Sequence, residues 1–206
     1  MKTIIRLGQY LEILGKVSES KKYISSKELG ELNYVTPSTV RQDFFYFDTL
    51  KGKTKRGYEI ESLKKEIVKI LGLEKGRKLI IIGAGKIGTA LSQYKDFKKL
   101  NIEFTAFFDI KESLIGKEIE GIRVYHLNDL KDYLKFHPEV EIATLCVPPD
   151  SAQDVADKAI KAGIKALWNF SPIIIKVPDN ILIEYEFVGT SLYSLIYAMK
   201  KRNIDK

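Results

Sequence analysis

The sequence predicts an α/β protein in which a small helical domain precedes a doubly wound parallel sheet and a C-terminal helix. Three observations predict this order. Helix-start signals occupy the first 50 residues, a glycine-rich turn follows a strand near residue 83, and strands alternate with helices from there to about residue 183. We expect the first domain at residues 1–75, the second at 76–187 and the final helix at 188–206.

The first helix is expected over residues 3–14. Its apolar residues recur at the spacing of one helix face, which is typical of an amphipathic helix. They are Ile4, Leu7, Leu11 and Leu14. We expect this face to pack in the core of the first domain.

Two further helix starts follow. Ser25 and Glu28 form a capping box, which opens a short helix that ends at Leu32. Thr36 and Pro37 supply an N-cap residue followed by proline at the first helical position. Two short helices joined by a tight turn make a helix-turn-helix, so we expect the second of them to be a DNA recognition helix.

The expected recognition helix has an apolar and a polar face. Val40, Phe44 and Phe47 share the face that we expect to pack in the core. On the polar face, arginine is the residue best suited to bind the major-groove edge of guanine. The residues of this helix that we expect to contact DNA are Ser38, Thr39, Arg41 and Gln42.

A basic loop follows this helix. Residues 51–56 hold four cationic side chains, and the strand-forming run Tyr58-Glu59-Ile60 comes next. We expect a hairpin whose tip is the wing of a winged helix-turn-helix domain, because each cation that neutralises a phosphate releases counterions. The cations expected to bind DNA there are Lys53, Lys55 and Arg56.

Charge and cysteine content limit the class of protein. Residues 1–75 carry 15 basic and 10 acidic side chains and residues 76–206 carry 19 and 17, so the basic excess is concentrated in the first domain. This balance fits a polyanionic partner, although a solvated lysine-rich surface gives the same count.

The cysteine content and the hydropathy indicate the compartment. The sequence has a single cysteine, no apolar run of membrane-span length and no signal-peptide core, so we expect a cytoplasmic protein without a membrane partner. We expect the cysteine, Cys146, to lie in a buried strand.

Residues 78–88 combine a strand with a glycine triplet that is typical of dinucleotide-binding sites. Gly83 permits a tight turn, Gly85 lets the backbone approach a pyrophosphate, and Gly88 lets the next helix pack closely on the strand. Asp109 ends a second apolar stretch 21 positions after Gly88. Because an acid at this place binds the adenosine ribose and repels a 2′-phosphate, we expect NADH and NAD+ as cofactors rather than NADPH and NADP+.

Strands and helices alternate beyond this turn, as in a Rossmann domain. Expected strands cover residues 78–82, 102–109, 123–124, 142–147, 166–169 and 181–183, and expected helices cover 87–99, 128–136 and 151–162, the last ended by Gly163. Ligands of such sheets lie across the carboxyl ends of the strands. The residues expected to bind the cofactor there are Gly83, Gly85, Lys86, Ile87, Gly88, Asp109, Val147, Pro148, Asn169, Phe170 and Ser171.

No set of residues in the sequence indicates catalysis or a metal site. The Tyr-x-x-x-Lys spacing of short-chain dehydrogenases begins at Tyr94 and at Tyr197, but these lie on the helix after the glycine turn and on the last helix, where neither suits chemistry. His126 and His137 fall near the ends of an expected helix, and we expect both to be surface or capping residues. A nucleotide site without catalytic groups, joined to a DNA-binding domain, is typical of a sensor rather than an enzyme.

Five segments of the chain match one known family in the order in which that family has them. They are residues 36–47, with Val40-Arg41-Gln42-Asp43, then 56–58, 83–94, 106–109 and 162–172, with Gly163-Ile164-Lys165 and Trp168-Asn169-Phe170. On these segments the chain closely resembles the bacterial redox-sensing repressor family Rex, from about Arg6 to Tyr197. The resemblance implies a homodimer that represses when NAD+ predominates and releases a pseudo-palindromic operator in double-stranded DNA when NADH binds. It also implies that the C-terminal helix is exchanged between the subunits.

The same resemblance assigns a switch. Tyr94 matches a tyrosine that pairs in the family with an acid of the partner subunit, just ahead of an aromatic residue that reaches the nicotinamide. Glu186 and Phe187 occupy those two positions, with Glu in place of the usual Asp. The final helix carries an apolar stripe that must be buried somewhere, either by exchange or on its own sheet. The stripe consists of Leu192, Leu195, Ile196 and Met199.

Three departures from the family pattern leave details open. Gln42 replaces a lysine of the recognition helix, Asp48 replaces a glycine, and Lys86 replaces an asparagine within the glycine turn. The first two leave the operator sequence and its affinity open. Two other functions also stay open at this point: an NAD-dependent oxidoreductase with an accessory N-terminal domain, and a CoA- or nucleotide-binding subunit of a larger enzyme.

Overall fold

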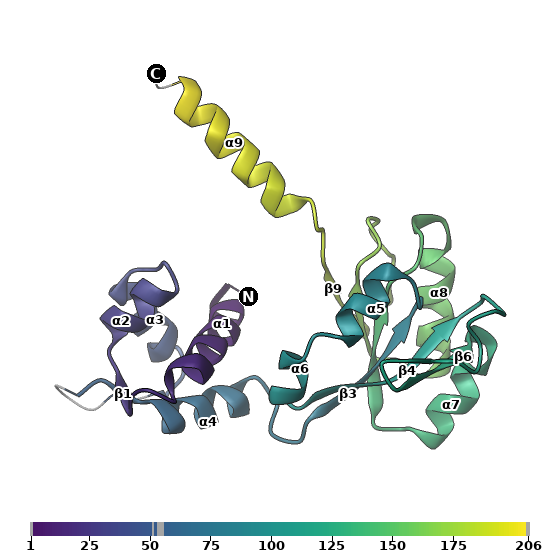
Figure 1. Ribbon diagram of the computed structural model, residues 1–206, viewed down its shortest axis with the longest axis horizontal. Coiled ribbons are helices and arrows are strands. Elements are labelled where there is room, and N and C mark those ends of the chain that lie inside the picture. Colours follow the sequence, from purple (N-terminus) through teal and green to yellow (C-terminus); the bar gives the residue numbers. More distant parts are fainter. Residues whose placement is uncertain (1, 51, 53–55, 205–206) are drawn as a thin grey trace. The chain divides into compact units, whose positions relative to one another are not determined.

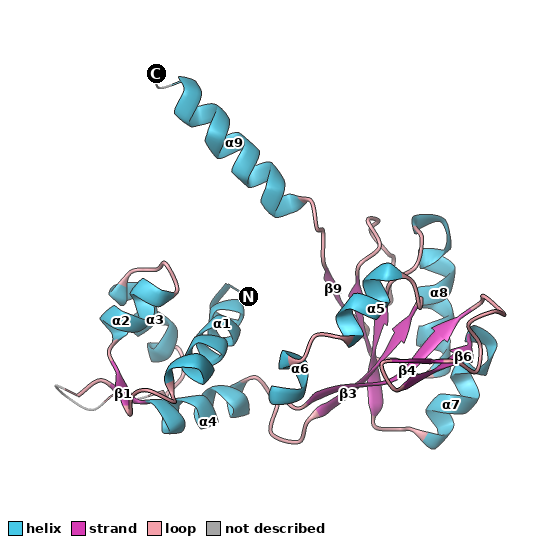
Figure 2. Ribbon diagram, viewed as in Figure 1, coloured by secondary structure: helices cyan, strands magenta, loops and turns pink. Residues whose placement is uncertain are grey.

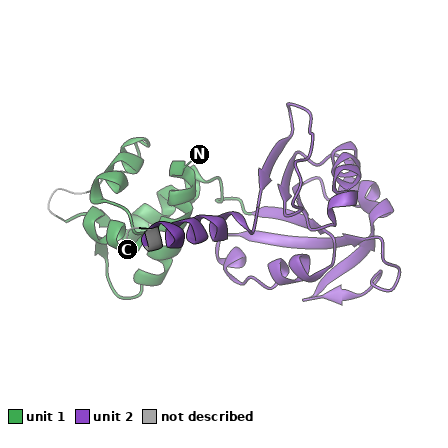
Figure 3. Ribbon diagram, turned by 90° about the horizontal axis from the view of Figure 1, so that it is seen from above, with its two compact units in different colours: residues 1–76 green, residues 77–206 purple. Residues whose placement is uncertain are grey.

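The computed structural model describes residues 2–50, 52 and 56–204 of the chain. The chain divides into two compact units, residues 1–76 and residues 77–206 (Figure 3). Each unit buries its own set of apolar side chains, which is the usual property of a domain.

The first unit consists of helices and a short two-stranded sheet (Figure 1). Its elements are α1 (Lys2–Val17), β1 (Tyr23–Ile24), α2 (Ser26–Leu32), α3 (Pro37–Phe45), β2 (Tyr58–Glu59) and α4 (Ile60–Ile70). Both expected N-caps are confirmed, because the hydroxyls of Ser25 and Thr36 each accept a hydrogen bond at 3.1 Å from the backbone N–H three residues later. Pro37 begins α3 as expected. The helix-turn-helix is thus formed by α2 and α3.

The buried face of α1 differs from the expected stripe at its N-terminal end. Three of the four stripe residues are buried as expected, but Ile4 is exposed and Tyr10 is buried. The ring of Tyr10 packs edge-on against Phe44 of α3, with 5.6 Å between the ring centres. This contact between α1 and α3 could not be read from the spacing of aliphatic residues.

The second and third helices also depart in detail from expectation. Only half of the capping box forms, because the Glu28 carboxylate is paired with Lys21. The third helix ends at Phe45, so Phe47 lies beyond it and is half-buried instead of sharing the helix face with Val40 and Phe44. The N–H of Tyr46 closes the last helical turn onto Gln42, and the chain turns away after it.

The basic loop lies partly outside the described residues, and with it Lys53 and Lys55. The strand after the loop is confirmed as β2, but its partner within the described residues is β1, the strand that precedes α2. Ile60 begins α4 and does not extend the strand. Sequence reasoning missed α4, although its buried residues Leu63 and Ile67 follow helical spacing from Ile60.

The second unit is built on a β-sheet, whose strands are magenta in Figure 2. The sheet has seven strands in the order β5-β6-β4-β3-β7-β8-β9. Its strands are β3 (Arg77–Ile82), β4 (Ile102–Asp109), β5 (Glu118–Ile119), β6 (Ile122–His126), β7 (Val140–Leu145), β8 (Ala166–Asn169) and β9 (Leu182–Tyr185). All neighbouring strands are parallel except β5 and β6, so the expected parallel sheet carries one antiparallel edge strand. Without β5 the strand order is that of the Rossmann fold, in which the order reverses between β3 and β7 and leaves a crevice at their carboxyl ends.

Helices cover both faces of this sheet (Figure 1). They are α5 (Lys86–Ser92), α6 (Asp96–Lys99), α7 (Leu130–Phe136) and α8 (Pro149–Ala162). Apolar side chains of α7 and α8 pack with Ile80 and Ile82 of β3, whereas Phe97 of α6 packs against the cluster that contains Leu79 and Ile81. Because successive side chains of β3 alternate in this way, both faces of the strand are buried.

The helix expected over residues 87–99 is in fact two helices, α5 and α6, separated by residues 93–95. The Ser92 hydroxyl donates to the carbonyl of Thr89 at 2.8 Å, a local bond that competes with helix propagation. The acidic Asp96 then opens α6, where it faces the positive end of the helix. Tyr94 therefore lies in the break and not on the first Rossmann helix.

Other boundaries differ by one to three residues. The strand β7 ends at Leu145, so Cys146 and Val147 follow the strand instead of belonging to it. A short 3-10 turn at Leu127–Asp129 precedes α7. As expected, Gly163 ends α8 in the left-handed conformation, with φ of 118°.

The C-terminal helix α9 (Thr190–Ile204) leaves its apolar stripe uncovered. Leu192, Leu195, Ile196 and Met199 are 53–58% exposed, which contradicts packing of the stripe on its own sheet. In the part of the chain that the structure describes, no helix has the length and apolar composition needed to cross a bilayer.

Candidate functional site

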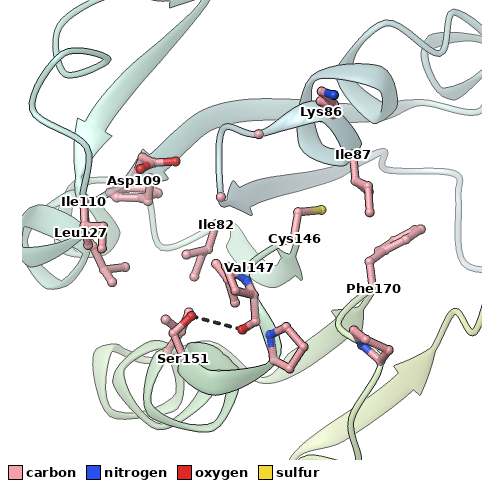
Figure 4. Close-up of a pocket in the computed structure, with 17 residues that line it drawn as sticks. Ile82, Lys86, Ile87, Asp109, Ile110, Leu127, Cys146, Val147, Ser151 and Phe170 are labelled. Carbon is pink, nitrogen blue, oxygen red and sulfur yellow. Dashed lines mark hydrogen bonds between the residues drawn. The ribbon is translucent and has the colours of Figure 1, made fainter.

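A cavity of about 630 Å³ opens at the carboxyl ends of β3, β4 and β7 (Figure 4). Its size lies in the range of small-molecule and cofactor sites. The expected cofactor-binding residues that line it are Gly83, Gly85, Lys86, Ile87, Asp109, Val147, Pro148 and Phe170. Several apolar residues of the cavity wall were not expected from the sequence, because they are distant from the glycine turn along the chain. They are Ile110, Leu127, Val155 and Pro172.

Each of the three glycines has a different reason to lack a side chain. Gly83 has a φ of 104°, and a Cβ there would lie 2.4 Å from the carbonyl oxygen of Cys146. A Cβ on Gly88 would lie 2.2 Å from the carbonyl oxygen of Gly83, so this glycine permits α5 to pack on the end of β3. A Cβ on Gly85 would meet no protein atom within 4 Å, although this residue lines the cavity. The open space at Gly85 fits a ligand that approaches the backbone.

Asp109 links the ends of two strands at the cavity. One carboxylate oxygen accepts a hydrogen bond from the backbone N–H of Ala84 at 2.7 Å, and the other accepts one from the N–H of Lys111 at 2.9 Å. Each carboxylate oxygen can accept more than one hydrogen bond, so the Asp109 carboxylate can still accept one from a ribose hydroxyl. Close by, Lys86 and Ile87 begin α5, and first-turn N–H groups have no partner inside a helix.

Asn169 and Ser171, which were expected to line the cavity, instead form hydrogen bonds that hold its wall in place. Asn169 is fully buried, and its amide bonds to the backbone of Ser171 and Ile173 at 2.9–3.1 Å. The Ser171 hydroxyl donates to the carbonyl of Val147 at 2.5 Å. These bonds hold the loop of Phe170 against the chain that follows β7. The structure thus places both polar side chains outside the cavity lining.

Cys146 lies at the cavity, half-buried, one residue after the end of β7. Burial raises the pKa of its thiol to about 12. The group therefore stays a thiol near neutral pH, which makes it a poor nucleophile and a poor redox sensor.

Tyr94 and Glu186, the two residues of the expected switch, do not line the cavity, and neither does Phe187. The expectation that Tyr94 and Phe187 bind the cofactor is thus not met by the cavity of the single chain. Tyr94 is 48% exposed, and its ring packs against Phe97 with 4.9 Å between the ring centres. Glu186 accepts a hydrogen bond at 3.2 Å from the indole N–H of Trp168. Phe187 stacks on Tyr185. All three are accessible enough for a contact with another chain.

The histidines occupy capping positions, as expected. His126 accepts a hydrogen bond through Nδ1 from the N–H of Asn128 at 3.2 Å, which caps the turn before α7. His137 ends α7 and stacks on Tyr133. Neither ring belongs to the cavity lining. The described residues contain no group of three or more side chains suited to hold a metal ion.

In the first unit, the polar face of α3 is accessible. Ser38, Arg41 and Gln42 are exposed, and so is Arg56 after the basic loop. The Arg41 guanidinium donates to the Ser26 hydroxyl at 3.2 Å. Thr39 is half-buried, and its hydroxyl lies 2.9 Å from that of the N-cap Thr36, so it contributes to the cap.

Sequence reasoning missed a buried ionic cluster that holds α3 in place. Asp43 accepts two hydrogen bonds from Arg6, at 2.6 and 2.5 Å, and one from the Tyr10 hydroxyl at 2.9 Å. The Thr3 hydroxyl donates to it at 3.0 Å. Burial alone raises the pKa of Asp43, but the hydrogen bonds from Arg6, Tyr10 and Thr3 outweigh burial and hold it below its usual value. The position of Asp43, next to Phe44 and three residues after Val40 on the apolar face of α3, was the sequence signal that could have revealed this cluster.

Comparison with known proteins covers the whole chain. Residues 74–173 match the family model described as CoA binding domain, and residues 1–44 match the one described as putative DNA-binding protein N-terminus. The redox-sensing transcriptional repressor Rex of Caldanaerobacter subterraneus subsp. tengcongensis is 39% identical over 207 residues, which covers 100% of this chain and 92% of the relative. The protein of the same name from Clostridioides difficile is 38% identical over 202 residues, with 98% and 95% covered.

Solved structures give the same result at full length. A crystal structure of RSP, a Rex-family repressor, matches with a TM-score of 0.86 at 37% identity and covers 99% of this chain and 95% of that one. RSP in complex with NAD+ and operator DNA matches with a TM-score of 0.88 at 37% identity, with 99% and 94% covered. RSP in complex with NADH matches with a TM-score of 0.87 at 36% identity, with 99% and 95% covered.

Proposed function

The chain belongs to the Rex family of redox-sensing transcriptional repressors, and from this premise we propose that it binds operator DNA and releases it when NADH occupies the cavity of the second unit. The observation that carries the proposal is full-length similarity to a repressor solved with NAD+ and operator DNA and also with NADH. Both halves of such a function have a counterpart in this chain. One is a cavity beside a glycine turn, and the other is an exposed polar helix face.

The cavity fits a dinucleotide. The space left open at Gly85 allows a pyrophosphate to lie against the backbone, where the first N–H groups of α5 can donate to it. The Asp109 carboxylate, at the end of β4, faces the place of the adenosine ribose and favours NADH and NAD+ over their 2′-phosphorylated forms. Val147, Pro148 and Phe170 supply apolar walls for the remainder of the cofactor.

DNA binding belongs to the first unit. We assign base contacts to Arg41 and Gln42 and further contacts to Ser38 and Thr39, since α3 is the second helix of the helix-turn-helix. Arg56 follows the basic loop and binds phosphate or a narrow minor groove in this proposal, together with Lys53 and Lys55. A pseudo-palindromic operator then requires two copies of α3.

A homodimer supplies those two copies. The exposed apolar stripe of α9 needs a partner, and exchange of this helix between two subunits provides one. In the dimer we place Tyr94 of one subunit against the Glu186 and Phe187 segment of the other, beside the cofactor. The bond from Trp168 leaves Glu186 with spare acceptor capacity for the tyrosine hydroxyl.

The test is a binding titration with a fluorescent duplex that the full-length protein has selected from a randomised pool. NADH should release the duplex, whereas NAD+, NADPH and coenzyme A should not; coenzyme A is included because the second unit matches the CoA binding domain model. NADH absorbance is followed in the same samples with small carbonyl compounds and should stay constant. If the protein selects no duplex from the pool but oxidises NADH steadily with a carbonyl compound, it is instead an oxidoreductase.

A further inference from the structure

One large apolar side chain on the polar face of α3, Phe45, is left uncovered by the residues that the structure describes. Phe45 is 90% exposed, although phenylalanine is among the residues most often found inside proteins. The buried residues of this helix are Val40, Asp43 and Phe44. Packing of the first unit therefore gives no reason for a phenylalanine at position 45.

Helix geometry places Phe45, the last residue of α3, on the same face as the residues assigned to DNA. At about 100° per residue, Phe45 projects about 20° from Ser38 and about 40° from Arg41 around the helix axis. Gln42 lies about 60° from Phe45, on the same side as Ser38 and opposite to Arg41. All three neighbours are polar and exposed, so Phe45 is an apolar side chain surrounded on this face by side chains that can form hydrogen bonds.

We propose that Phe45 reads thymine by packing against its 5-methyl group in the major groove. The inference rests on the proposed function, because it requires α3 to enter that groove. The thymine methyl is the one apolar feature that a base presents there, and phenylalanine is among the side chains that contact it. Phe45 lies about 6 Å beyond Arg41 along the helix, which corresponds to about two base-pair steps. Arg41 then reads a guanine, and Phe45 reads a thymine about two steps away.

The experiment removes the methyl group without changing the base pair. The probe is the duplex selected from a randomised pool by the full-length protein, in which each thymine in turn is replaced by deoxyuridine. For the unchanged protein, loss of the contacted methyl should weaken binding about fourfold per half-site, the effect of about one buried methylene. For Phe45→Ala, the same replacement should have no effect, whereas Phe45→Leu should keep the sensitivity.

Two controls separate a DNA contact from other effects. Phe136→Ala removes an equally apolar side chain, 82% exposed, from the end of α7 in the second unit and should leave discrimination between thymine and uracil unchanged. Phe45→Ala should keep its thermal midpoint, its NADH affinity and its mass in sedimentation, because the side chain is exposed.

The outcomes are distinct. If Phe45→Ala retains the full methyl effect, or if no thymine replacement affects the unchanged protein, Phe45 does not read thymine. A change in mass of Phe45→Ala, with equal weakening on thymine and uracil duplexes, would identify Phe45 as a protein contact and overturn the inference. If the unchanged protein selects no duplex at all, the proposed function itself fails.

Discussion

Asp109 accepts a hydrogen bond at 2.7 Å from the backbone N–H of Ala84, so the acid that ends β4 holds the glycine turn that follows β3. The same carboxylate faces the cavity. In the proposed function, one side chain therefore holds the turn that binds the pyrophosphate and also sets the charge at the ribose end of the cofactor. These two roles make different predictions when the charge and the hydrogen-bonding capacity are changed separately.

Asp109→Asn removes the negative charge and keeps one oxygen acceptor for a backbone N–H. We expect the preference for NADH over NADPH to narrow by about tenfold, because a repulsion of about 1–2 kcal/mol towards the 2′-phosphate is lost. Calorimetric titration with both cofactors measures this change. Lys111→Ala is the matched control and should widen the preference slightly. An unchanged preference in Asp109→Asn would show that the acid serves the turn alone.

Substitutions of Gly85 and Gly88 should separate ligand binding from folding. Gly88→Ala should lower the free energy of unfolding by about 1–3 kcal/mol, since its Cβ would meet the Gly83 carbonyl at 2.2 Å. Gly85→Ala should leave stability unchanged but weaken NADH binding by more than about tenfold, because its methyl group would occupy space needed by the pyrophosphate. Thermal unfolding and NADH titration test both, with Gly8→Ala in α1 as the control. Equal NADH affinity in Gly85→Ala would show that the pyrophosphate does not lie against the backbone at Gly85.

Arg41 and Arg56 should differ in the kind of DNA contact that they make. Arg41→Ala should cost about 1–3 kcal/mol on the selected duplex and relax the preference at one base pair. Arg56→Ala should weaken all duplexes alike and flatten the slope of log K against log salt by about one. Binding to a set of single-base variants at several salt concentrations tests both residues. Uniform weakening by Arg41→Ala would show a phosphate contact only.

Much of the fold could be predicted from local signals. The strands β3, β4 and β8 lie within one residue of the expected ranges, because a continuous apolar run bounded by turn residues is typical of a strand buried on both faces. The caps at Ser25 and Thr36 depend on hydrogen bonds that span three residues, so the sequence also predicts them.

What was missed depends on contacts between distant residues or on a single local bond. Asp43 and Arg6 are 37 positions apart, and no periodicity within α3 shows that its acid is buried against α1. At the break between α5 and α6, the Ser92 hydroxyl bonds to the carbonyl of Thr89 and the Tyr94 N–H bonds to that of Leu91, inside an otherwise helical pattern. The burial of Asn169 depends on its bonds to the loop that follows it, and a position at the end of a strand does not show these bonds in advance.

The Asp43 cluster predicts a pH dependence of stability. Because the pKa of Asp43 is held below its usual value, its carboxylate stabilises the fold above the pKa of the unfolded chain, and this contribution is lost as pH falls through the folded value. Asp43→Asn should cost about 3 kcal/mol at pH 7, where Arg6 loses its charged partner, and the difference should shrink in acid.

Urea unfolding followed by far-UV circular dichroism between about pH 7 and pH 3 measures this difference. Asp132→Asn is the control, because Asp132 is an exposed acid paired with Lys135 and its loss should have no measurable effect. A constant difference between Asp43→Asn and the unchanged protein across this range would contradict the assignment of the charge.

We expect ligand binding in the cavity of the second unit to be coupled to DNA binding by the polar face of α3 in the first. The most direct test is calorimetric titration of NADH into the free protein and into the preformed complex with the selected duplex. If NADH weakens duplex binding by some factor, the duplex must weaken NADH binding by the same factor, which is typically about 5–150-fold. In Tyr94→Phe, NADH should still bind, but the factor by which NADH and the duplex weaken each other's binding should fall towards one. Equal NADH affinity with and without the duplex in the unchanged protein would contradict the account.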